Sequence, residues 1–330
     1  MRNDEYLAVS SRARLARNLF GIPFSRKMSG YDEEKVLNQV REALSGTDFT
    51  LYAMKDLDPD QKRALMEKHL ISPDLMKNRQ GAAMISRDER ISVMIGEEDH
   101  LRIQSFSDGL SVEKALSTAL QMDELLGKKL SYAQDRLLGY LTACPTNVGT
   151  GLRVSVMLHL PALTMTGRMR ELQQELSKHG IAVRGMYGEG SAALGQLYQL
   201  SNSVTLGITE ENIAKQVKET ALWIMEREEE TRAALMRSSG LALSDRMGRA
   251  YGILRYARRL SYEEFMGLWS DCMMGAEEQG LSARGMKEIL NAGQPSQLNL
   301  GDWNQEMPVD ARRAEAVRNL LVSMEQEKQK

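Results

Sequence analysis

The sequence has little of what marks secreted, membrane or metal-binding proteins. Two cysteines, Cys144 and Cys272, occur in 330 residues, and neither forms a CxxC pair, so a disulfide framework is excluded. No apolar run reaches about 18 residues, and the N-terminus has no apolar signal segment. We therefore expect a protein of the reducing cytoplasm that has no membrane partner. The four histidines stand in separate segments without an HExxH pattern, which predicts no metal ion held by protein ligands.

An excess of one sign of charge is missing as well. The 43 basic and 45 acidic side chains give a net charge of −2, whereas nucleic-acid-binding proteins usually have a basic excess, so no nucleic-acid partner is expected. Aromatic residues make up only 5% of the chain, while its 21 methionines predict an adaptable core. The nucleotide-binding patterns GxxxxGK[ST], HRD and DFG do not occur. If a nucleotide binds, other residues must hold its phosphates.

The pattern of apolar residues changes near residue 230. Before it, short strand-like runs alternate with helical patterns, and after Gly240 the pattern is almost wholly helical. A length of 330 residues is enough for about two domains. We predict an α+β domain with an antiparallel-rich sheet over residues 1–230 and a small all-helical domain over residues 231–330. The strand candidates are "LAVSSRAR", "ISVMI", "LRIQSF", "VSVMLHL" and "IAVRGMY", and the predicted helix starts are Ser111, Thr209, Ser244, Ser261 and Ser282, with Pro308 before the last helix.

Three consecutive carboxylates follow the strand candidate at residues 91–95. In "ISVMIGEEDHLRIQSF" the apolar alternation stops at Gly96 and resumes at Leu101, which predicts a strand, a turn and a second strand. Carboxylates repel one another and favour water, so this segment taken alone is most simply a solvated acidic turn. The turn residues are Glu97, Glu98, Asp99 and His100.

Five arginines stand in or beside strand candidates, near polar or glycine-containing turns. Arg12 and Arg14 are two residues apart, so on a strand both side chains point to the same face. A single arginine of this kind is usually a surface residue, but five together are hard to explain by packing. Guanidinium groups match phosphate oxygens bidentately, and the set therefore predicts a site for a polyanion. The five are Arg12, Arg14, Arg102, Arg153 and Arg184.

Four segments resemble, in the same order, the catalytic domain of the phosphagen (guanidino) kinases: "SSRARLARN", "EEDHLRIQ", "CPTNVGTGLR" and "RGMYGEG". The resemblance covers about residues 7–230, and "KHLIS" with "GEGSAALGQLYQLSN" is most similar to the bacterial branch that phosphorylates arginine in proteins. It implies a glutamine-synthetase-like catalytic domain, in which helices flank a curved antiparallel sheet. A C-terminal helical extension, as expected over residues 231–330, is also a feature of that branch.

The resemblance implies roles for individual residues. Glu98 would be the catalytic base and Glu189 the second carboxylate on the guanidinium, with Cys144 beside that group. ATP would be the phosphoryl donor and would carry Mg²⁺, and Glu97 or Asp99 would bond the water ligands of the ion. This chemistry suits the residues, because a guanidinium, with a pKa above about 12, attacks phosphorus only after a proton leaves it. The residues implied to hold the nucleotide are Ser11, Arg12, Arg14, His69, Arg102, Arg153 and Arg184.

Two positions depart from the family pattern. Gly96 stands where the family usually has asparagine, which predicts a less rigid turn before the two glutamates. Near the C-terminus, "VDARRAE" is similar to the phosphoarginine-sensing motif "RDxxRA" of the same bacterial branch, with Val309 in place of its first arginine. A phosphoarginine pocket at Asp310 and Arg313 is therefore expected to bind weakly.

The resemblance thus implies an ATP-dependent kinase for arginine residues in proteins, which marks those proteins for Clp-type proteolysis. Two alternatives stay open: a kinase for free arginine or another small guanidine, and a catalytically weak adaptor that binds phosphoarginine or a protease partner. The resemblance further implies a homodimer, and as partners a zinc-binding activator protein and a Clp-type ATPase or protease.

Overall fold

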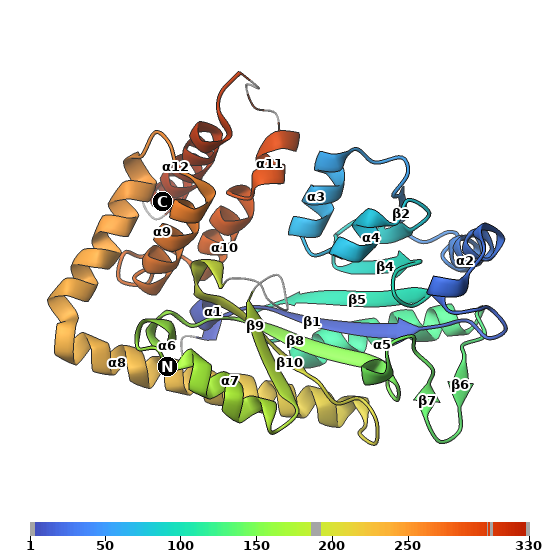
Figure 1. Ribbon diagram of the computed structural model, residues 1–330. Coiled ribbons are helices and arrows are strands. Elements are labelled where there is room, and N and C mark those ends of the chain that lie inside the picture. Colours follow the sequence, from blue (N-terminus) through green and yellow to red (C-terminus); the bar gives the residue numbers. More distant parts are fainter. Residues whose placement is uncertain (1–3, 186–192, 302, 304–305, 328–330) are drawn as a thin grey trace.

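An eight-stranded antiparallel sheet forms the centre of the molecule (Figure 1). The structure is a computed structural model that describes residues 4–185, 193–301, 303 and 306–327. A small hairpin of β6 (Gln134–Asp135) and β7 (Gly139–Tyr140) stands apart from the sheet. In order across the sheet, the strands are β2 (Phe49–Ala53), β3 (Ala82–Ser86), β4 (Ile91–Ile95), β5 (Leu101–Asp108), β1 (Ala8–Arg17), β8 (Leu152–His159), β10 (Leu197–Asn202) and β9 (Ile181–Gly185).

Five of these strands coincide with strand candidates from the sequence. β4 covers the same residues as "ISVMI", and β1, β5, β8 and β9 overlap the other four candidates. The strands β2, β3 and β10 were not predicted. β3 and β10 are buried along nearly their whole length, so the alternation typical of half-buried strands is missing from their sequences.

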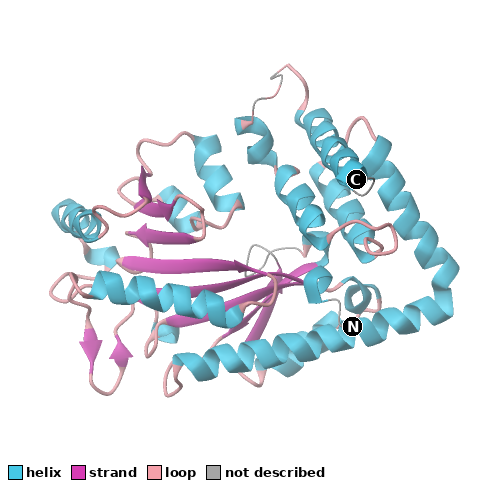
Figure 2. Ribbon diagram, turned by 180° about the vertical axis from the view of Figure 1, so that it is seen from behind, coloured by secondary structure: helices cyan, strands magenta, loops and turns pink. Residues whose placement is uncertain are grey.

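Helices cover the face of the sheet seen in Figure 2. α5 packs on β1 and β5, and α8 packs on β8 and β10. Ala13 and Leu15 of β1 are fully buried in the main apolar core beneath these helices. Within the described part of the chain, no helix is both long and apolar enough to span a bilayer. The helices are α1 (Asp4–Leu7), α2 (Gly30–Ala43), α3 (Pro59–Glu67), α4 (Pro73–Lys77), α5 (Val112–Gly127), α6 (Pro161–Met165), α7 (Met169–Ser177), α8 (Glu210–Tyr256), α9 (Tyr262–Met274), α10 (Ala283–Ala292), α11 (Pro295–Leu300) and α12 (Val309–Glu327).

The long helix α8 continues through residue 230, where the sequence indicated a domain boundary. Thr209 caps its start as predicted, since the Thr209 side chain accepts a hydrogen bond from the Asn212 N–H. At Ser239 the backbone leaves the helical region (φ −142°, ψ 29°), and the helix bends (Figure 1). Ser244 lies inside α8, so the prediction of a helix start there is wrong, and the domain boundary itself stays a prediction. The predicted caps of α9 and α10 are confirmed at Ser261 and Ser282.

The C-terminal helices pack on one another and on the sheet. Trp269 of α9 is fully buried in a second apolar core, which also contains Met157 of β8 and Leu197 of β10. A polar contact joins α11 to α3, where the Glu67 carboxylate accepts hydrogen bonds from the N–H and the hydroxyl of Ser296, both at 3.0 Å. The helical extension is therefore built directly onto the rest of the molecule.

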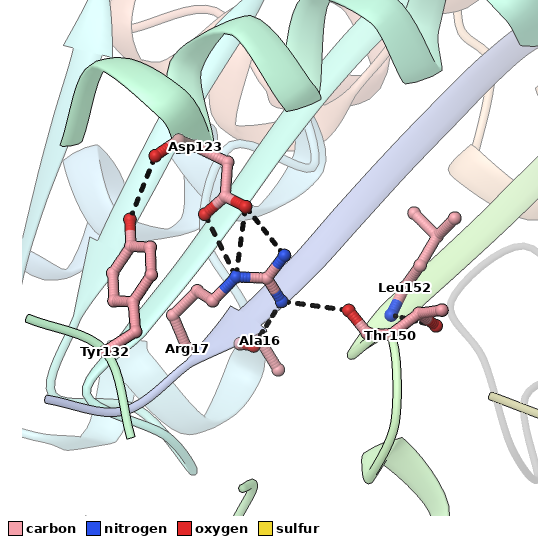
Figure 3. Close-up of polar contacts among 6 residues, drawn as sticks. All are labelled: Ala16, Arg17, Asp123, Tyr132, Thr150 and Leu152. Atoms are coloured by element: carbon pink, nitrogen blue, oxygen red, sulfur yellow. Dashed lines mark hydrogen bonds and ion pairs between the residues drawn. The ribbon is translucent and has the colours of Figure 1, made fainter. Parts of the chain in front are cut away.

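A buried ion pair braces the end of β1 (Figure 3). The Arg17 guanidinium donates to both carboxylate oxygens of Asp123 on α5, with Nη2 2.7 Å from Oδ2. Its carbon lies 3.4 Å from the centroid of the Tyr140 ring, a cation–π contact. Nη1 donates to the carbonyl oxygens of Ala16 and Thr150. One side chain thus joins β1, α5 and the segment that leads into β8.

We expect Asp123→Ala to destabilise the protein by about 3–5 kcal/mol, because it leaves the Arg17 charge buried and unpaired. Urea unfolding followed by circular dichroism measures the change. The double variant Arg17→Met/Asp123→Leu is the matched control, since it removes both charges and should recover most of the lost stability. A double variant as unstable as Asp123→Ala would contradict this explanation.

Candidate active site

The strand register brings the predicted arginines together on one face of the sheet. Arg14 of β1 lies directly opposite Arg153 of β8 and Gln104 of β5. Arg102 is two residues from Gln104 on the same strand, so it points to the same face. Ala13 and Leu15 alternate with Arg14 along β1, and their side chains point into the core beneath α5. The arginines therefore lie on the other face of the sheet.

Two glutamine side chains belong to the same face and were not predicted from the sequence. Gln199 of β10 lies opposite Arg184 of β9, and its Oε1 accepts a hydrogen bond of 2.8 Å from Arg12 Nη2. Gln104 stands two residues after Arg102, and this spacing was the signal that could have revealed it. Gln199 had no such signal, because β10 itself was not recognised.

The arginines line a pocket of about 140 Å³ between the sheet and the segment of α3 and α4. Burial, with the charges of Arg102 and Arg153, lowers the pKa of Arg12 to about 9, and burial with the charges of Arg12, Arg102 and Arg153 holds the pKa of Arg14 well below its ordinary value. The Nε atoms of Arg14 and Arg153 are buried without a hydrogen-bond partner among the described residues. Buried cations are normally paired, so the pocket fits a polyanion. Its lining is Arg12, Arg14, Met66, His69, Ile71, Ser72, Pro73, Met94, Arg102, Gln104, Arg153, Arg184 and Gln199.

His69 lies at this pocket, between α3 and α4. Its backbone has a φ of 60°, and its carbonyl oxygen accepts a hydrogen bond of 2.8 Å from the Gln104 side chain. Burial and the charges of Arg12 and Arg14 lower the pKa of His69 to about 3. The imidazole is therefore neutral at pH 7 and adds no further positive charge to the pocket.

Ser11 is not part of the pocket. It precedes Arg12 by one residue on β1, so its side chain points to the opposite face of the sheet. The Ser11 hydroxyl is fully buried, donates to the carbonyl oxygen of Gly109 at 2.8 Å and accepts from the Ser111 N–H at 3.0 Å. Ser11 therefore holds the turn before α5, away from the arginines.

The acidic turn stands at the end of the arginine face. The Glu97 carboxylate pairs with Arg102 at 2.5 Å. Burial opposes ionisation of Glu97, but the Arg102 charge and the Ser72 hydroxyl outweigh it and hold the pKa of Glu97 below its ordinary value. The Glu98 carboxylate is exposed, without a hydrogen-bond or ion-pair partner among the described residues. Partial burial and the charges of Asp99 and Glu97 raise the pKa of Glu98, which suits a group that accepts a proton.

Asp99 and His100 anchor the turn. Asp99 is 3% exposed, and its Oδ1 accepts hydrogen bonds of 2.6 Å from Asn18 Nδ2 and from the Ala143 N–H. His100 accepts a hydrogen bond of 2.9 Å at Nδ1 from the Leu19 N–H. These bonds tie the acidic turn to the end of β1 and to the segment before Cys144, so the Asp99 carboxylate serves to hold the turn.

Cys144 lies in the same neighbourhood. It is half-buried, and its Sγ is 3.1 Å from Thr146 Oγ1. Burial and the charges of Arg184 and Arg102 lower the pKa of Arg153, and the charge of Glu98 acts in the opposite direction. The hydrogen bond from the Ala143 N–H to Asp99 places Cys144 next to a residue that contacts the acidic turn. The second predicted carboxylate, Glu189, lies outside the described residues.

The backbone at Gly96 can accept the asparagine that the family usually has there. Gly96 has a φ of 74°, in the left-handed region. A Cβ atom at this position would meet only Asn78 Nδ2 at 3.6 Å and Gly81 Cα at 3.7 Å, which are ordinary contacts. Asparagine enters this region more easily than other side chains do.

We expect Gly96→Asn to leave the free energy of unfolding within about 1 kcal/mol of the parent and to retain activity. Gly96→Val should instead cost about 1–3 kcal/mol, because a β-branched side chain is strained at positive φ. Thermal unfolding of the two variants makes the comparison. Equal stability of the two would show that the backbone angle does not restrict this position.

The residues of the predicted phosphoarginine pocket are engaged within the C-terminal helices. Arg313 of α12 is 1% exposed, and its guanidinium donates to the carbonyl oxygens of Gly293 and Leu260 at 2.8 and 2.7 Å. It also pairs with Asp310 at 3.0 Å. Arg313 thus joins α12 to the segments before α9 and after α10, and the pocket stays a prediction.

Two family profiles match the chain. The ATP:guanido phosphotransferase C-terminal catalytic domain matches residues 33–231, so the chain belongs to the ATP:guanido phosphotransferase family. The protein-arginine kinase McsB C-terminal domain matches residues 240–330. Within the family, the chain is thus a member of the McsB-like protein-arginine kinases, which confirms the resemblance found in the sequence. Membership makes the protein a phosphotransferase that uses ATP.

Curated relatives cover most of the chain. A protein-arginine kinase of Caldanaerobacter subterraneus is 46% identical over 279 residues, which are 82% of this chain and 83% of the relative. A protein-arginine kinase of Moorella thermoacetica is 42% identical over 328 residues, 96% of this chain and 94% of the relative. The McsB C-terminal profile covers α9 to α12, and the Moorella thermoacetica relative covers nearly the whole chain.

Solved structures share the fold. A lombricine kinase has a TM-score of 0.64 at 24% identity and covers 71% of this chain and 69% of its own. The substrate-free duplicated taurocyamine kinase from Schistosoma mansoni has a TM-score of 0.60 at 26% identity and covers 68% of this chain and 34% of its own. The predicted fold, an antiparallel sheet flanked by helices with a helical C-terminal region, is confirmed.

Proposed function

We propose that the protein transfers the γ-phosphoryl group of ATP to the guanidino group of arginine side chains in proteins. The observation that carries this proposal is a pocket of arginines with an acidic turn at its edge, because the first suits a polyphosphate and the second suits a cation. The names of the curated relatives support protein arginine as the acceptor.

In this proposal the clustered arginines hold the ATP phosphates. Arg14 and Arg153 offer buried Nε–H groups that have no partner in the described part of the chain. An anion would satisfy these donors and relieve the repulsion within the cluster. The charge of the transferred phosphoryl group would then meet guanidinium groups that are already in position. The proposed set is Arg12, Arg14, Arg102, Arg153 and Arg184, with His69 at the edge of the pocket.

Glu98 is the proposed catalytic base. Its carboxylate, which has no partner among the described residues, would accept a proton from the guanidinium. At the same time one nitrogen forms a bond to the γ-phosphorus, and the bond from phosphorus to the leaving oxygen of ADP breaks. Glu189 is proposed to bind the remaining N–H groups of the guanidinium, and Cys144 to lie beside it. The hydrogen bond from the Ala143 N–H to Asp99, which ties the segment of Cys144 to the acidic turn, supports this arrangement.

Mg²⁺ is proposed to enter with ATP, held mainly by phosphate oxygens and water. The described residues contain no group of three or more His, Cys, Asp or Glu side chains that could hold a metal by themselves. Of the two carboxylates predicted to bond its water ligands, Glu97 borders the pocket through Arg102. Asp99 is bonded to Asn18, which favours Glu97 for this role.

The division of the chain and its partners are proposals that rest on the family. Residues 1–230 would form the catalytic domain, and residues 231–330 a helical domain that binds phosphoarginine or a partner. The proposed biological role is to mark proteins for Clp-type proteolysis in the cytoplasm. A homodimer, a zinc-binding activator and a Clp-type ATPase or protease belong to the same proposal.

The test is to incubate the purified protein with Mg²⁺–ATP and an unfolded arginine-rich protein, with free arginine in a parallel reaction. Phosphoarginine is detected by mass spectrometry under non-acidic conditions, because the P–N bond is labile in acid. Label on protein arginine supports the proposal. Label on free arginine alone would identify a small-guanidine kinase, and no label from folded protein would favour the adaptor.

A further inference from the structure

Four large apolar side chains are exposed on two segments, the one after β1 and the β6–β7 hairpin, which lie at the same end of the sheet as the acidic turn. The chain has only five phenylalanines. Phe20 is 76% exposed and Phe24 41%, and in the β6–β7 hairpin Leu137 is 91% and Leu138 45% exposed. Exposed apolar side chains that gather beside a functional site mark a surface for a partner. We refer to Phe20, Phe24, Leu137 and Leu138 as the apolar rim.

Hydrogen bonds connect the phenylalanines of the rim to the acidic turn. The Leu19 N–H donates to His100 Nδ1, and His100 Nε2 donates to the carbonyl oxygen of Pro23 at 2.7 Å. Phe20 and Phe24 therefore each follow directly after a residue bonded to the histidine of the turn. The Phe20 N–H also donates to the Ser131 carbonyl oxygen at 2.8 Å, which joins this segment to the chain before the hairpin.

A turn that is stabilised by the Asp135 side chain holds the leucines of the rim. Asp135 Oδ1 accepts hydrogen bonds from the N–H groups of Leu137 and Leu138, at 2.8 and 3.0 Å. The base of the hairpin is tied to the site, because Asn18 Nδ2 donates both to Asp99 and to the carbonyl oxygen of Leu141. The hairpin projects at the same end of the sheet at which β1 ends and β4 leads into β5 (Figure 1).

We propose that the apolar rim binds substrate polypeptide on either side of the arginine being phosphorylated, so that the protein prefers arginines flanked by large apolar residues. Folded proteins bury such segments, so the rim selects unfolded chains as substrates. A segment of this kind has a cationic arginine and apolar flanking side chains. The acidic turn would bind the arginine, and the apolar rim next to it would bind the flanking side chains. This inference rests on the proposed function.

The test compares two unstructured peptides, each with one central arginine, flanked by leucine and phenylalanine in one and by serine in the other. Initial rates of phosphoarginine formation give kcat/KM for each peptide. We expect the parent protein to favour the apolar peptide by about tenfold or more, as burial of one or two large apolar side chains would produce. Phe20→Ser/Leu137→Ser should bring the ratio of the two kcat/KM values close to one.

The matched control is Leu241→Ser, because Leu241 is 89% exposed on α8 and does not belong to the rim. It should leave the ratio unchanged. A parent ratio near one, with both peptides phosphorylated, would overturn the rim and leave the proposed function intact. Failure to phosphorylate either peptide would count against the function itself. The inference would also be overturned if Phe20→Ser/Leu137→Ser kept the parental ratio of the two kcat/KM values. Analytical ultracentrifugation would then show whether the rim joins two copies of the chain.

Discussion

Glu98→Gln should lower the rate of arginine phosphorylation by roughly 10²–10⁴-fold, because glutamine cannot accept the proton that the guanidinium must lose. The folded structure should be unaffected, since the Glu98 carboxylate is exposed and without a partner among the described residues. Phosphoarginine formation at saturating ATP measures the loss, and thermal unfolding checks the fold. Glu171→Gln, at an exposed glutamate on α7, is the control and should retain full activity.

The pH profile separates loss of a base from loss of substrate binding. Glu98 acts as a base only when it is deprotonated, so kcat/KM should fall as the pH is lowered through its pKa. Because partial burial and the charges of Asp99 and Glu97 raise that pKa, the fall should begin at a higher pH than for an ordinary glutamate. The residual activity of Glu98→Gln should lack this acidic limb. A variant with parental turnover would rule out Glu98 as the base.

Arg14→Met should have opposite effects on stability and activity. Turnover should fall by about 10²–10³-fold, because a positioned donor to the transferred phosphoryl group is lost. Without nucleotide, the variant should be more stable by about 1 kcal/mol, since the folded state no longer carries a half-buried charge that Arg12, Arg102 and Arg153 repel. The sign follows from the pKa of Arg14, which folding lowers, so that its charged form costs stability at neutral pH.

Thermal unfolding with and without ATP tests this trade-off. The parent should gain stability on addition of ATP, and Arg14→Met should gain less because it binds the nucleotide more weakly. Arg14→Lys is the matched comparison: it keeps the charge but loses the guanidinium fork, so it should show the activity loss without the gain in stability. If Arg14→Met were less stable than the parent protein in the absence of ATP, charge repulsion among the arginines would not destabilise the folded protein, and this explanation would be wrong.

Much of the site could be predicted from the sequence. The alternation in "ISVMI" and "LRIQSF" located β4, β5 and the turn that carries Glu98, and the spacing of Arg12 and Arg14 put both on one face of β1. The same rule could have excluded Ser11, which alternates with them. These features depend only on local periodicity, which the order of residues encodes directly.

The pairing of strands that are distant in the sequence was harder to predict. β10 is buried along its whole length and has no alternation, so neither the strand nor Gln199 was found. The sequence indicated a long helix from Thr209 to Met236, but it gave no sign that α8 bends at Ser239 and continues to Tyr256. Strand register and helix bends are set by contacts between distant segments, and a local pattern does not contain them.

The sequence by itself determined the chemical inventory: five arginines beside strands, an acidic turn, and the motifs that resemble one kinase family. Only the tertiary structure decided which charges face one another. The antiparallel register set Arg14 opposite Arg153. Asp99 and His100 anchor the turn, and Glu98 is left as its carboxylate without a partner in the described part of the chain. The physical reason is that composition and spacing specify which groups are present, whereas burial and charge repulsion act on groups that only folding brings together.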